Sequence, residues 1–229
     1  VGKPLVNDIP SRAEGDADET PDDPEKAAEE AIHDIWVFQY DQNGKQLIMP
    51  RYYEVTSTEI KKLNIRLAEG VDSHVYVLAN TCDPEWAKGK DFSTVEKFVD
   101  YKYPFTEDNV EMGTDEYLLM EGSVKETIRK ETDLHPIDIH LTRMMAKISF
   151  KYVKAEEAKG LVVTRVLIHN MPTMMRMEET PENENYPLGD FETLAVTLDK
   201  ELEPGMVYTF YMPANRRGTS TNTDPKYKN

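Results

Sequence analysis

The 229-residue chain has one cysteine, Cys82, and no apolar run as long as the roughly 18 residues of a membrane-spanning helix. A single cysteine excludes an internal disulfide framework and a cysteine-rich zinc site. Basic residues are also few, because 27 Lys and Arg stand against 43 Asp and Glu, a formal net charge of −16. That balance excludes the clustered cationic surface with which proteins bind nucleic acid or an anionic membrane leaflet.

The motifs of common catalytic sites are absent as well. No Gly-x-Ser-x-Gly, P-loop or Gly-x-Gly-x-x-Gly pattern occurs, and the 11 glycines are scattered. Cys82 follows a predicted strand with no histidine nearby in sequence, which favours a small, partly buried residue. The five histidines form no HExxH motif and no pair at helical i, i+4 spacing: His33, His74, His135, His140 and His169. We therefore predict that the chain is not an enzyme, needs no cofactor and has no identifiable metal ligands.

Alternation of apolar and polar residues predicts a mainly β fold. Both faces of residues 32–40 are apolar, which is typical of a central strand. Residues 41–44 end in Asn-Gly, which supplies the positive φ angles of a tight hairpin, and residues 46–53 return as the partner strand. Further strands are predicted at residues 60–67, 74–80, 118–121, 135–141, 146–150, 161–168 and 207–212. So many short strands favour an antiparallel β-sandwich.

Helical and polar segments interrupt the strands. Residues 93–101 place Val95, Phe98 and Val99 on one helical face, which predicts one short amphipathic helix. Residues 11–23 are rich in acid and poor in apolar side chains, as expected of a solvated connector. A helical turn or two is predicted directly after it, where Asp23-Pro24-Glu25 reads as a cap and a first turn.

Four segments carry a family resemblance: residues 31–41 with the Gly44 turn, 75–81, 141–150 and 208–218. In order and spacing they resemble the amino-terminal domain of the Bacteroidetes fimbrillins, the FimA-type and Mfa-like subunits and minor or tip components of type V pili. The last two segments are the more specific.

The resemblance implies a transthyretin-like β-sandwich of about seven strands with one short inserted helix. It implies export to the cell surface and outer membrane as a lipoprotein precursor whose signal has been removed. The expected domains are residues 1–30, an N-terminal strand and acidic processing loop; residues 31–213, the sandwich; and residues 214–229, a linker to a second domain. Membrane contact would come only through a lipid anchor absent from this chain.

The resemblance also implies assembly with other fimbrial subunits by donor-strand exchange. In relatives a trypsin-like protease cuts after a basic residue in the loop behind the first strand, and Arg12 fits that position. Removal of the strand that carries Leu5, Val6 and Ile9 would open a groove to which a partner strand can add by β-augmentation. The other interpretation of Arg12 is a solvated linker residue.

A glycan-binding β-sandwich module of a surface polysaccharide-utilisation system is the alternative function. In that case the partner is a glycan or protein on a host or bacterial surface, and Tyr52, Tyr53, Tyr101 and Tyr103 would line an exposed aromatic patch. The aromatic residues of the predicted central strand, Trp36, Phe38 and Tyr40, are expected to pack in the core instead.

Overall fold

The computed structural model describes residues 29–55, 63–69, 71–110, 117–129, 136–156, 160, 162–177, 193–198 and 201–213. These residues form two compact units. Unit 1 contains the described residues up to Tyr101 and those from 117 to Met144, and unit 2 contains the rest. The domain boundaries expected from the sequence stay a prediction. The boundary between the two units at Met144 lies within residues 31–213, the predicted sandwich. Among the described residues no helix combines the length and the apolar character needed to cross a membrane.

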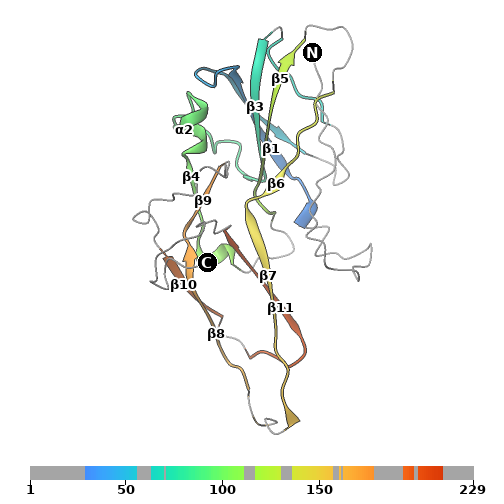
Figure 1. The fold of residues 1–229 in the computed structure, drawn as a ribbon, viewed down its shortest axis with the longest axis vertical. Helices are drawn as coiled ribbons and strands as arrows, with labels where there is room; N and C mark the ends of the chain where they lie inside the picture. The colour runs from blue at the N-terminus through green and yellow to red at the C-terminus, as the bar shows by residue number, and fades with distance from the viewer. Residues whose placement is uncertain are drawn as a thin grey trace, which may run out of the picture. The chain divides into compact units, whose positions relative to one another are not determined.

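Unit 1 is built on a five-stranded antiparallel sheet of order β2-β1-β3-β5-β6 (Figure 1). Every residue of β1 except the last is buried, and Val37 pairs with Arg51 on one side and Val77 on the other. The prediction of a central strand is confirmed. The strands are β1 (Asp34–Asp41), β2 (Leu47–Glu54), β3 (Val71–Ala79), β5 (Met120–Ile128) and β6 (Thr142–Arg143).

The β1–β2 turn and helix α2 (Val95–Val99) contact each other through Gly44. Gly44 has the positive φ, 68°, that the Asn-Gly signal predicts, but Asn43 does not, and the turn is wider than the predicted tight hairpin because the Asp41 N–H donates to the Gln46 carbonyl. The Gly44 carbonyl accepts the Val95 N–H at 2.8 Å. A Cβ at Gly44 would lie 2.9 Å from the Val95 Cβ, so both backbone angle and packing require glycine. Thr94 caps α2 by accepting the Lys97 N–H, which confirms the predicted helix at its expected place.

An aromatic cluster fills the core between β1 and α2. Phe38 and Phe98 have ring centroids 4.8 Å apart, and Phe92 stacks on Trp86 at 5.3 Å. The Tyr40 hydroxyl donates to the Phe92 carbonyl, and burial raises the pKa of Tyr40 far above its ordinary value. Trp36, Phe38 and Tyr40 are all buried, so the prediction that they pack in the core is confirmed.

Unit 2 consists of three two-stranded antiparallel ladders. The longest joins β7 (Met145–Lys151) to β11 (Val207–Pro213) through seven residue pairs, side by side in Figure 1. The other two join β8 (Val166–Pro172) to β10 (Thr193–Leu198) and β4 (Lys102–Pro104) to β9 (Met174–Arg176). A short 3-10 helix, η1 (Glu107–Asn109), precedes Val110, whose carbonyl accepts the Tyr211 N–H. The buried apolar side chains of unit 2 include Phe105, Val110, Met171, Met175, Met177, Leu202, Phe210 and Tyr211.

The mainly β character, the antiparallel pairing and the short inserted α-helix of the predicted sandwich are confirmed for the described residues. The described residues form eleven strands rather than the predicted seven or so, and three of these strands are only two or three residues long: β4, β6 and β9. Glu29 and Glu30 are helical, at the end of the predicted helical turn whose start lies outside the described residues.

Two predicted strands are not strands where the structure describes them. Residues 63–68 have no strand pairing, and at Ala68 the Gln39 side chain bonds both the N–H and the carbonyl in place of a neighbouring strand. Residues 136–141 form no strand either, although Ile137, Ile139 and Leu141 alternate as buried residues. There the His140 carbonyl lies directly against Gly122, in the space that a Cβ would need.

Candidate functional site

Asp34, the first residue of β1, holds a fully buried carboxylate at one end of the sheet. Its Oδ1 accepts the Thr81 N–H and the Thr81 hydroxyl, both at 3.1 Å, and its Oδ2 accepts the Cys82 N–H at 2.7 Å. Antiparallel pairing of β1 with β3 brings these residues together, since the Asn80 N–H donates to the Asp34 carbonyl. Asp34 therefore fixes the path of the chain as it leaves β3.

Asn80 supports the same junction from the other strand. Its side-chain N–H groups donate to the carbonyls of Ala31 and Leu118, and its Oδ1 accepts the His33 N–H at 2.8 Å. Asn80 and Cys82 have φ angles of 66° and 53°, and asparagine tolerates this left-handed region better than most residues. A polar network whose members are all bonded specifies one geometry for the chain entering β1.

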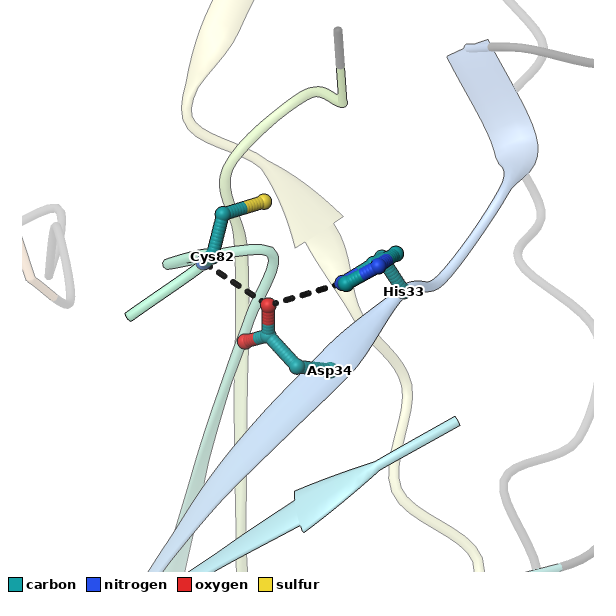
Figure 2. Close-up of side chains that lie close together, drawn as sticks. All are labelled: His33, Asp34 and Cys82. Carbon is teal, nitrogen blue, oxygen red and sulfur yellow. Dashed lines mark hydrogen bonds and ion pairs between the residues drawn. The ribbon is translucent and has the colours of Figure 1, made fainter. Parts of the chain in front are cut away.

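His33, Asp34 and Cys82 converge at this junction, as Figure 2 shows. One ligand atom from each side chain lies within 4.8 Å of the other two, and no other such trio is found in the described part of the chain. The His33 Nδ1 is 3.4 Å from the Asp34 Oδ2. The His33 side chain is 48% exposed and Cys82 is exposed, so the trio joins a buried anion to two accessible side chains.

The electrostatics keep the thiol protonated. Partial desolvation of the thiol raises the pKa of Cys82 to about 11 although the residue is exposed, and the charge of Asp34 and a hydrogen bond to it act in the same direction. The pKa of neighbouring Tyr52 is raised as well, first by burial and then by Asp34. A nucleophilic cysteine needs a lowered pKa or a base beside the sulfur, whereas here a carboxylate disfavours the thiolate. The carboxylate therefore works against an ionised, nucleophilic thiol, although His33 lies within 4.8 Å of it.

The trio does not follow from any motif or spacing in the sequence. Cys82 was expected to be partly buried, and the structure corrects this, because the residue as a whole is exposed. The signal in the sequence is Asp34 itself, an acidic residue in an otherwise apolar strand. A buried acid requires hydrogen-bond donors nearby, so its presence indicates a polar site. The predicted processing site Arg12 and the strand residues Leu5, Val6 and Ile9 lie outside the described residues and stay predictions.

The four tyrosines of the expected aromatic patch are each only partly exposed. Tyr52 packs on Trp36 with ring centroids 5.5 Å apart, while the Tyr53 hydroxyl accepts the Arg66 N–H. These two tyrosines are consecutive in β2 and so point to opposite faces of the sheet. Tyr101 packs on the Trp86 ring within unit 1, whereas Tyr103 belongs to β4 of unit 2.

Solved structures with a similar fold come from fimbrial and adhesion proteins. The tip fimbrial protein Mfa3 of Porphyromonas gingivalis, truncated at its C-terminus, matches with a TM-score of 0.58 and 14% identity, over 82% of this chain and 65% of that chain. A candidate cell adhesion protein of Parabacteroides distasonis matches with a TM-score of 0.62 and 13% identity, over 93% of this chain and 70% of that one. A candidate polysaccharide-binding protein of Bacteroides thetaiotaomicron gives 0.55 and 15%, over 82% and 64%. At these identities the likeness shows the fold, and the chain spans about two thirds of the length of each structure.

The fold is thus one shared with surface fimbrial and adhesion proteins. The sequence model of the major fimbrial subunit protein FimA matches residues 9–151, more than half of the chain, and the chain belongs to this family. No curated protein matches it in sequence. The resemblance to fimbrillins is confirmed, and membership of a family of structural subunits confirms that the chain is not an enzyme.

Proposed function

We propose that the chain is a structural and adhesive fimbrial subunit that assembles by donor-strand exchange after proteolysis behind Arg12. The observation that carries this proposal is the FimA family match over residues 9–151, joined to an antiparallel β fold. On this proposal the fold is a transthyretin-like sandwich, and the protein reaches the outer membrane as a lipoprotein precursor. Residues 1–30 contain the removable strand and residues 214–229 lead to a second domain.

Contacts that begin at Glu29 support a cut upstream of the sheet. Arg143 in β6 lies 3.7 Å from a Glu29 carboxylate oxygen and 3.9 Å from one of Glu30. The Asn80 side chain binds the backbone of Ala31 directly afterwards. These contacts hold the chain from residue 29 onward to unit 1. Cleavage behind Arg12 would leave the contacts intact, because all of them lie after the cut.

Limited trypsin digestion tests the processing step. We expect cleavage behind Arg12 before any site between residues 32 and 213, and its loss in Arg12→Gln. Lys26→Gln is the matched control, because Lys26 is the other basic residue of this region that is not followed by proline. Rapid cutting between residues 32 and 213 in the wild-type chain contradicts the proposal.

A peptide competition tests the strand-exchange step separately. The cleaved protein should form ladders on denaturing gels and filaments by electron microscopy. An excess of a peptide of residues 1–12 should suppress both, because it refills the groove, and a peptide with Leu5, Val6 and Ile9 replaced by serine should not. Cleaved protein that stays monomeric, or assembly that ignores the first peptide, argues against donor-strand exchange.

Glycan binding is the second candidate function, and it is favoured by the likeness to the candidate polysaccharide-binding protein of B. thetaiotaomicron. In this chain the partly exposed ring of Tyr52, which is tilted against Trp36, offers an aromatic surface on β2. A glycan array separates the two functions. Saturable binding that is lost in Tyr52→Ala, by a monomer that does not assemble after proteolysis, supports the glycan module instead of the pilin.

A further inference from the structure

We propose that His33, Asp34 and Cys82 form a binding site for a Zn²⁺-like transition-metal dication in unit 1. The ligands are the Cys82 thiolate, the His33 Nδ1 and the Asp34 Oδ2, with a water in the fourth position. Nothing in the fimbrial function of the family requires this site, so the inference does not depend on strand exchange.

The distances fit the small radius of such an ion. Bond lengths of about 2.0–2.3 Å in a tetrahedron place neighbouring ligand atoms roughly 3.3–3.6 Å apart. The His33 Nδ1 and the Asp34 Oδ2 are already 3.4 Å apart, and all three ligand atoms lie within 4.8 Å of one another. To reach these distances, the side chains of Cys82 and His33 must move closer to the ion. Both are exposed and can rotate, whereas Asp34 is fixed by three hydrogen bonds.

The buried carboxylate supplies an independent reason for a cation. A carboxylate has about four acceptor positions. Two donors from Thr81 and the Cys82 N–H occupy three of them, and the His33 Nδ1 and the Cys82 thiol share the fourth, where a metal would take their place. Those three donors are neutral, and within the described residues the sole ion pair of Asp34 is with His33, which is charged only when protonated. A fully buried anion is stabilised by a positive charge, and a bound dication provides one at neutral pH.

The donor set selects the class of metal. Thiolate and imidazole favour Zn²⁺ and related ions, whereas Ca²⁺ and Mg²⁺ prefer sites made of oxygen. Binding replaces the proton of the Cys82 thiol, which passes to solvent, and leaves the imidazole proton of His33 on Nε2. Protons therefore compete with the metal, and affinity should fall as the pH is lowered.

Cobalt spectroscopy tests the site directly. We expect the untagged wild-type chain to bind one Co²⁺ with a thiolate-to-cobalt charge-transfer band, to release it to Zn²⁺ and to ignore Ca²⁺. Cys82→Ser should abolish the band, and Cys82→Ser and His33→Ala should each weaken Zn²⁺ binding by at least about tenfold. His140→Ala is the matched control, since His140 is exposed and outside the trio, and it should bind like wild type.

A second measurement needs no variant. Zn²⁺ should protect Cys82 of the wild-type chain from alkylation and raise the thermal midpoint of unit 1, because the ion binds the folded state. Circular dichroism checks that each variant is folded. Absence of the charge-transfer band in the wild type, absence of protection, or Zn²⁺ affinity that is unchanged in both Cys82→Ser and His33→Ala overturns the proposal.

Discussion

Asp34→Asn tests how far one buried carboxylate stabilises unit 1. Asparagine keeps the size of the side chain but has one acceptor oxygen. If that oxygen keeps the two Thr81 donors, the new NH₂ group faces the Cys82 N–H, which donates to Asp34 Oδ2 at 2.7 Å in the wild type. A lost hydrogen bond to a charged group costs about 1.5–3 kcal/mol, and two donors facing each other add to it. We expect the free energy of unfolding to fall by about 2–3 kcal/mol.

Urea unfolding followed by tryptophan fluorescence measures this loss in unit 1 alone. The chain has two tryptophans, Trp36 and Trp86, and both belong to unit 1. Linear extrapolation in urea then gives the free energy of unfolding for each variant. Asp41→Asn is the control, because one Asp41 oxygen accepts both exposed N–H groups of the turn and asparagine keeps that oxygen. It should stay within about 0.5 kcal/mol of wild type. An equally small effect of Asp34→Asn would refute the argument from burial.

Three further predictions use the same fold. Gly44→Ala should destabilise unit 1 by about 2 kcal/mol in the urea assay, because Gly44 has a positive φ and contacts Val95. Gly89 has φ 76° but open space around it, so Gly89→Ala should reduce the free energy of unfolding by only about 1 kcal/mol. Asp91 should titrate near pH 2 by NMR, because the Lys97 hydrogen bond lowers its pKa to about 2. The stability that ionised Asp91 contributes is complete above the ordinary carboxyl pKa and is lost as the pH falls towards 2. In Lys97→Ala the Asp91 carboxyl should titrate closer to 3.8. Metal-free Cys82 should alkylate more slowly than a free cysteine at neutral pH, and the rate should reach half its maximum near pH 11.

The elements that follow from local pattern were predictable. Residues 32–40 are apolar on both faces, which indicates a strand that is buried on both sides. The resulting strand β1 is buried and lies between β2 and β3 in the sheet. The Asn-Gly turn and the helix at Val95–Val99 likewise depend on backbone angles and caps within a few residues. These signals lie within single segments, so no tertiary information is needed to read them.

Features that depend on distant partners were not predictable. The donors to Asp34 are 47 and 48 residues away in sequence, so neither its burial nor the trio could be read from one strand. Residues 63–68 look like a strand, yet the Gln39 side chain satisfies the Ala68 backbone instead. The alternation at residues 136–141 correctly predicts which side chains are buried but not how the backbone is bonded.

The place of Pro50 in the sheet has a consequence for how copies of the chain can meet. Pro50 lies opposite Phe38 in β2, the strand at one end of the described sheet. Proline has no N–H, so the outer edge of β2 lacks one donor near its middle. An uninterrupted edge on a crowded cell surface would be a template for indiscriminate sheet growth, and a proline is one of the devices that prevent it. The interruption therefore disfavours sheet extension along β2.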